Sequence, residues 1–72
     1  MYTDVRVKFA RLLKKLREKK GLSVSQLAKK AGVSRQHVRD LELTYPTKRV
    51  TIITIEKLAR GLDVPMWALL KF

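Results

Sequence analysis

The chain has 72 residues, of which 46% are apolar and 32% are charged, and its 17 Lys and Arg against 6 Asp and Glu give a net charge of +11. This length allows one domain at most, spanning residues 1–72, and the lack of cysteine excludes disulfides and thiolate metal sites. The excess positive charge favours a polyanionic partner, with nucleic acid first and an anionic membrane surface or an acidic protein second.

The first predicted helix runs from about Thr3 or Asp4 to Lys20. Lys and Arg occupy most positions on its outer side, and we interpret them as a solvated face that raises long-range attraction to a polyanion without touching it. Gly21 supplies the left-handed residue that ends such a helix. The apolar residues that recur at helical spacing and form the inner face are Val5, Phe9, Leu12, Leu13 and Leu16.

Two short helices separated by a glycine turn follow. Ser23 is a good cap for the first of them, and Gln26 stands in the capping-box position. Ser34 caps the next helix, which we expect over about Arg35 to Leu43. The segment from about 24 to 43 therefore reads as helix, tight turn, helix, an arrangement whose second helix can enter the major groove of DNA.

A fourth helix, capped by Thr51, and a last short helix complete the pattern. The β-branched run at residues 50–55 has strand propensity, but helical spacing and the lack of a partner strand favour a helix. Pro65 suits the first turn of the last helix, Met66 to Leu70. We expect an all-α fold, a compact bundle of about five short helices. The predicted inner face of the fourth helix contains Ile52, Ile55, Leu58, Ala59 and Leu62.

Several spaced motifs resemble the lambda-repressor-like helix-turn-helix family, of the phage-repressor, Cro and XRE type. They are LREKKGLS at 16–23, QLA at 26–28, AGVSR at 31–35, LE at 41–42 and LARGLDV at 58–64. The tail RVTI at 49–52, followed by 58–64, looks most like controller proteins of restriction–modification systems, and phage repressors look similar. The resemblance implies a sequence-specific regulator of transcription that binds double-stranded DNA as a homodimer on a two-fold operator.

The resemblance also implies which residues meet DNA. Base-reading positions fall on Arg35, Gln36, His37, Arg39 and Asp40. Arg35 suits guanine and Gln36 adenine, Arg39 suits a base or a phosphate, and Asp40 either accepts from cytosine or orients its neighbours. Val24 stands where the family often has glutamine, so only its backbone N–H can meet a phosphate. The other expected phosphate contacts are Ser23, Ser25, Ser34, Tyr45, Thr47, Lys48 and Arg49.

Two further expectations concern structure and assembly. In the family, positions matching Arg17 and Glu42 form a partly buried ion pair, and the alternative is two independent surface charges. Family dimers associate through the C-terminal region, where this chain has Met66, Trp67, Leu70 and Phe72. The alternative for Trp67 and Leu70 is that they complete the core.

Other functions fit the sequence less well. An antitoxin-like module that binds a protein partner, with DNA binding secondary, is the main alternative. A membrane-surface role for the basic first helix leaves the later helices without a purpose. His37 lacks the neighbours of a metal or acid–base site, so we expect no enzyme, catalytic residue, metal, cofactor or small-molecule ligand. The N-terminus lacks a signal-peptide core, and we expect a cytoplasmic, nucleoid-associated protein.

Overall fold

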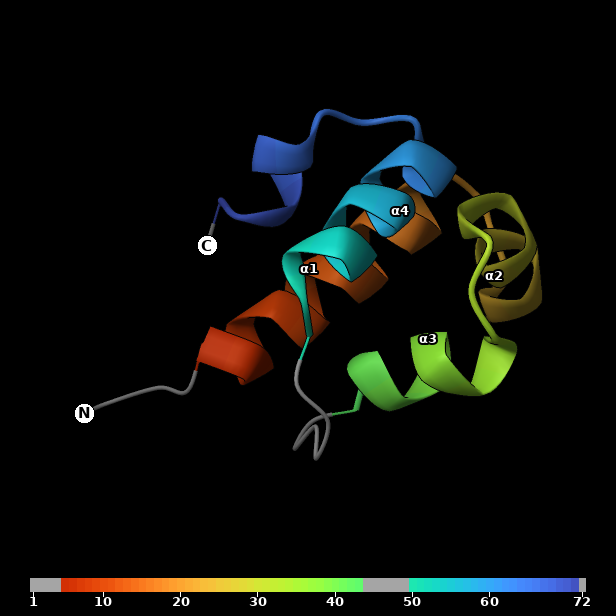
Figure 1. The fold of residues 1–72 in the computed structure, drawn as a ribbon, viewed down its shortest axis with the longest axis horizontal. Helices are drawn as coiled ribbons and strands as arrows, with labels where there is room; N and C mark the ends of the chain where they lie inside the picture. The colour runs from red at the N-terminus through yellow and green to blue at the C-terminus, as the bar shows by residue number, and fades with distance from the viewer. Residues whose placement is uncertain (1–4, 44–49, 72) are drawn as a thin grey trace.

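A computed structural model describes residues 5–43 and 50–71 (Figure 1). The described part contains helices and no strand, which confirms the all-α prediction. Within residues 5–43 and 50–71, the expected bundle of about five helices is corrected to four α-helices and one turn of 3-10 helix, because the last segment is too short for an α-helix. The elements are α1 (Val5–Lys19), α2 (Val24–Ala31), α3 (Arg35–Leu41), α4 (Ile52–Leu62) and the 3-10 helix η1 (Met66–Leu69).

The predicted capping signals between the first three helices are present. Gly21 and Gly32 have positive φ angles of 69° and 73°, in the left-handed region that favours glycine. The Ser23 hydroxyl accepts a hydrogen bond from the Gln26 backbone N–H at 3.1 Å, and the Gln26 side chain accepts one from the Ser23 N–H at 2.8 Å. This reciprocal capping box fixes where α2 begins.

Helix α3 is shorter than predicted. It begins after Ser34, whose hydroxyl accepts from the His37 N–H at 3.0 Å, but it ends at Leu41 rather than Leu43. Glu42 caps it with φ of −91° and ψ of 0°, outside the α-helical region. Residues 44–49, which follow in the loop, lie outside the described residues.

Helix α4 begins where expected and ends at a residue other than glycine in the left-handed conformation. The Thr51 hydroxyl accepts from the Thr54 N–H at 3.2 Å, and the segment that follows is helical rather than extended. Asp63 ends the helix with a positive φ of 57°. Ile52 is 70% exposed and so does not belong to the inner face, because the first turn of α4 projects beyond the core.

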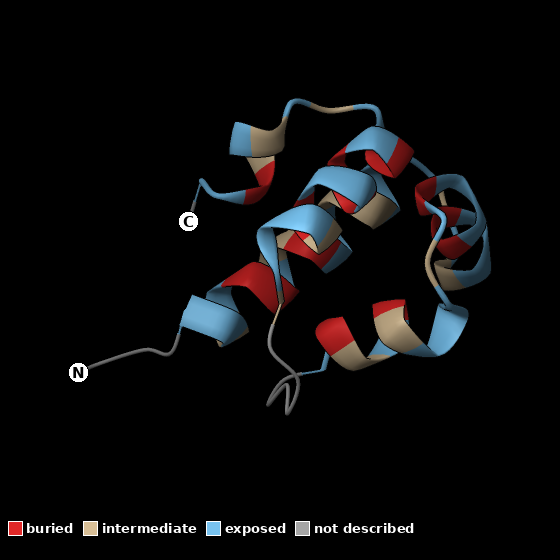
Figure 2. Cartoon of the chain, viewed as in Figure 1, coloured by how far each residue is buried: buried red, intermediate tan, exposed pale blue. Residues whose placement is uncertain are grey.

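One hydrophobic core joins all five elements (Figure 2). Its largest fully buried side chains are Leu13, Leu27, Leu58, Leu62, Leu69 and Val38. Val5 was predicted to face inward but is 51% exposed, because it starts α1 beyond the reach of the other helices. Leu69 rather than Trp67 or Leu70 is the core residue of η1.

Candidate nucleic-acid interface

Helices α2 and α3 form the predicted helix-turn-helix. At the turn, the backbone N–H groups of Gly32 and Val33 both donate to the Ala28 carbonyl, at 2.9 and 3.0 Å. Val38 and Leu41 are buried in the core, and the buried parts of α3 are red in Figure 2. A helix as short as α3 is not stable alone, so packing of Val38 and Leu41 holds it in place and leaves its opposite side facing outward.

The outward side of α3 carries the expected base-reading residues. Arg35, Gln36 and Arg39 are exposed, and His37 and Asp40 are half-buried. The Gln36 side-chain amide donates to the Asp40 carboxylate, from Nε2 to Oδ1, at 2.9 Å. An exposed guanidinium can pair with guanine through two hydrogen bonds, and an amide can do so with adenine. Asp40 therefore restricts how the Gln36 amide is presented.

The predicted phosphate contacts are only partly within the described residues. Ser23, Ser25 and Ser34 are exposed near the starts of α2 and α3, and Val24 is half-buried against the core. The Ser23 and Ser34 hydroxyls act as acceptors in their capping bonds, which leaves each hydroxyl proton able to donate. Tyr45, Thr47, Lys48 and Arg49 lie outside the described residues.

Arg17 and Glu42 come together across α1 and the end of α3. Arg17 Nε donates to Glu42 Oε2 at 2.7 Å, and Nη2 donates to Oε1 at 3.0 Å. Arg17 Nη1 also donates to the Leu22 carbonyl at 2.8 Å. The two side chains are 12% and 8% exposed, so this pair is shielded from solvent, unlike most surface ion pairs. It fixes the C-terminal end of α3 to α1.

The C-terminal segment exposes apolar surface. Trp67 is 64% exposed and Leu70 46%, whereas Met66 is half-buried against the core and Phe72 lies outside the described residues. Ile53 is a further exposed apolar residue, which the sequence analysis did not name. It is 67% exposed beside Ile52 in the first turn of α4. Its position two residues before the inward Ile55 was the available signal, because that spacing places it off the inner face.

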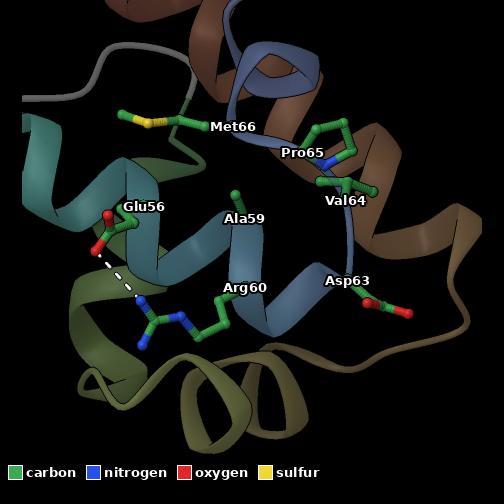
Figure 3. A pocket seen from close by; sticks show the side chains of 7 residues that line it. All are labelled: Glu56, Ala59, Arg60, Asp63, Val64, Pro65 and Met66. Atoms are coloured by element: carbon green, nitrogen blue, oxygen red, sulfur yellow. Dashed lines mark hydrogen bonds and ion pairs between the residues drawn. The ribbon is translucent and has the colours of Figure 1, made fainter.

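A shallow pocket of about 480 Å³ lies between α4 and the segment leading to η1 (Figure 3). Glu56 and Arg60, one turn apart on α4, form an ion pair along one side of it at 3.3 Å, with both side chains more than half exposed. Such an exposed pair contributes little stability. The lining residues are Glu56, Ala59, Arg60, Asp63, Val64, Pro65 and Met66. The pocket is thus separate from the outward side of α3.

Neither a metal-binding cluster nor a membrane-spanning helix occurs within residues 5–43 and 50–71. No three His, Cys, Asp or Glu side chains there gather closely enough to hold a metal ion. None of the helices described combines the length and apolar character needed to cross a bilayer.

Comparisons with known proteins agree with this geometry. Residues 13–66 match the helix-turn-helix family HTH_3. The restriction-modification controller protein C.AhdI from Aeromonas hydrophila is 38% identical, over 89% of this chain and 94% of that one, with a TM-score of 0.82. The wild-type controller protein C.Esp1396I is 25% identical over 93% and 84%, with a TM-score of 0.83.

A hypothetical transcription factor, NHTF from Neisseria, is 31% identical, over 93% of this chain and 75% of that one, with a TM-score of 0.84. Comparison with curated protein sequences gives no match. The family match spans most of the chain and the similar structures cover nearly all of it. The chain therefore belongs to the HTH_3 family of helix-turn-helix proteins, the XRE-type DNA-binding regulators of transcription.

Proposed function

We propose that this protein binds a specific double-stranded DNA sequence by inserting α3 into the major groove. The observation that carries the proposal is the outward side of α3, where Arg35, Gln36 and Arg39 are exposed on a helix anchored by Val38 and Leu41. The major groove is wide enough for one helix, and these side chains are the types that read guanine and adenine edges. Ser23, Ser25, Ser34 and the Val24 N–H then serve as phosphate contacts beside it.

The regulator works as a homodimer on a two-fold operator. Exposed Trp67 and Leu70 supply apolar surface for self-association, together with Met66 and Phe72. Two copies of α3 then read half-sites about 34 Å apart, one turn of the duplex. Similarity to C.AhdI supports a controller-type role, in which the protein occupies a promoter region upstream of its own gene.

Selection of bound sequences from random duplexes tests the proposal, with the stoichiometry of the complex measured alongside. The expected result is a two-fold motif bound by two chains, which footprinting then locates upstream of the gene. Failure to enrich any motif, or enrichment of a single asymmetric site bound by one chain, contradicts the proposal. The Arg35→Ala protein is the matched control, because its selected motif should lose preference at one base position in each half-site.

A further inference from the structure

The exposed side of α1 carries a row of positively charged residues that plays no part in the proposed reading of bases by α3. Lys8, Arg11, Lys15 and Lys19, here called the α1 stripe, are all exposed. At a rise of 1.5 Å per residue the stripe is about 16 Å long, which runs alongside about five phosphates of one DNA strand at 3.4 Å each.

The α1 stripe faces away from α3. Arg17 marks the side of α1 that is turned to α3, because it bonds Glu42 at the end of that helix. With 3.6 residues per turn, Lys15 and Lys19 lie about 160° around the helix from Arg17, Lys8 about 180° and Arg11 about 120°. A duplex read by α3 is therefore not the one that the stripe meets.

These charges oppose the stability of the free helix. Arg11, Lys15 and Lys19 follow one another at i, i+4 spacing, where like charges repel. The first turn of α1 has no acidic residue, although the positive end of the helix dipole favours one there. Within α1, seven Lys and Arg stand against one acidic residue, Glu18, whereas a helix that needed only solubility would carry the two signs of charge more evenly. A polyanion laid along the stripe removes this repulsion.

Duplex DNA fits this surface better than a membrane does. Phe9, Ala10 and Leu13 form the apolar side of α1, and all three are buried in the core. A helix that lies in a membrane interface must bury its apolar side there, and this side is already occupied. A straight row of cations on a rigid helix needs only a line of phosphates, and binding there releases counterions.

We propose that the α1 stripe is a second DNA-binding surface, which holds a second duplex segment while α3 reads the operator. The contact is made to the phosphate backbone and carries no sequence preference. Each dimer then joins two stretches of DNA. The two surfaces can be tested separately. Binding by α3 is measured with one short duplex, and binding by the stripe is measured as capture of a second duplex by protein that is already bound to DNA.

The test compares two variants of equal net charge. One carries Lys8→Gln, Arg11→Gln, Lys15→Gln and Lys19→Gln, which keep good helix formers along α1. The control carries Lys29→Gln, Lys30→Gln, Lys57→Gln and Arg60→Gln, which remove as many exposed cations from α2 and α4. Circular dichroism melts establish that both fold. A long duplex on beads is saturated with protein, and capture of a fluorescent random-sequence duplex is measured.

The wild-type and control proteins should capture the second duplex, and the stripe variant should capture about tenfold less. For this capture, the slope of the logarithm of the binding constant against the logarithm of salt concentration should be smaller by up to about 3.6 in the stripe variant. Binding of one short duplex, followed by anisotropy, should change less than about threefold in the stripe variant. Equal capture by stripe and control variants overturns the proposal, and so does absence of capture by the wild type. Parallel loss of both duplexes overturns it too. If the stripe variant captures the second duplex normally but no longer binds phosphatidylserine vesicles, the proposal is overturned, and the stripe is a membrane-binding surface instead.

Discussion

The guanidinium of Arg17 and the carboxylate of Glu42 form a two-point pair between α1 and the cap of α3, with N–O distances of 2.7 and 3.0 Å. The hydrogen bond to Glu42 raises the pKa of Arg17, charge attraction to Glu42 adds to the rise, and partial burial opposes it. A base with a raised pKa stabilises the fold at every pH below its unfolded pKa and loses that effect only above it. Arg17 thus adds no pH dependence to stability near neutrality.

Arg17→Ala should lower the free energy of unfolding by about 2–3 kcal/mol, because the nearly buried Glu42 carboxylate loses its partner. Arg17→Lys should cost less, about 1–2 kcal/mol, since it keeps the charge but cannot bond both carboxylate oxygens and the Leu22 carbonyl together. Urea unfolding curves followed by circular dichroism measure both values.

Arg60→Ala is the control for that comparison, because Arg60 is paired with Glu56 but exposed. Its effect should stay within about 0.5 kcal/mol. If Arg17→Ala and Arg60→Ala were equally mild, the Arg17–Glu42 pair would not be what ties α3 to α1.

Asp40→Asn should broaden sequence preference at the base read by Gln36. The Asp40 carboxylate accepts from Gln36 Nε2 at 2.9 Å, and an asparagine in its place no longer fixes which way the amide is turned. Discrimination at that one position should fall by about 1 kcal/mol, while affinity rises because a negative charge beside the phosphates is removed. Binding to a panel of single-base operator variants measures both effects. Unchanged discrimination would mean that Asp40 does not orient Gln36.

Substitutions at Ser34 should separate its capping role from its proposed phosphate contact. Ser34→Ala loses the acceptor for the His37 N–H and should destabilise the protein by about 1 kcal/mol. Ser34→Asp keeps an acceptor at the cap and should retain stability, but it places a negative charge at the DNA backbone and should weaken binding. Thermal melts and operator affinities are measured for both proteins. Normal operator binding by Ser34→Asp would remove Ser34 from the interface.

Trp67→Ala should weaken the proposed dimer. A large exposed aromatic that becomes buried between subunits typically contributes about 2 kcal/mol or more, which corresponds to about 30-fold in the dimer Kd. Val5→Ala is a matched control, because Val5 is an exposed apolar residue at the far end of α1. Sedimentation equilibrium measures the monomer–dimer balance. Equal Kd values for the two variants would place the dimer interface elsewhere.

Local signals in the sequence predicted most of this fold. The caps at Ser23, Ser34 and Thr51 depend on hydroxyl groups next to helical spacing, and each forms its expected bond. The errors concern residues whose neighbours are set by tertiary structure. Val5 and Ile52 fit the helical period of the inner faces, but they lie at helix ends where no other element covers them.

The outward side of α3 was also accessible from the sequence, because Val38 and Leu41 define its inner side by period alone. The Gln36–Asp40 bond fits one of the roles open to Asp40, whose partner the sequence could not decide. The roles of these residues toward DNA remain predictions, since they depend on a partner that the chain does not contain.

Gly61→Ala should destabilise the protein. In an exposed helix, replacing glycine by alanine normally stabilises the helix by about 1 kcal/mol. Gly61 lies in α4 against α2, and a Cβ there would stand 2.9 Å from the Ala31 backbone nitrogen and 3.0 Å from the Ala31 Cβ. Because backbone cannot move aside as a flexible side chain does, the two helices must separate, at a cost of about 1–3 kcal/mol.

The melting temperature should therefore fall by at least about 4 °C for a domain of this size. Adding Ala31→Gly should recover part of that loss, because it removes the Cβ contact and leaves the contact with the backbone nitrogen. The Ala31→Gly protein alone supplies the reference for the glycine's own effect on α2. A higher melting temperature for Gly61→Ala would show that α2 and α4 do not pack as closely as described.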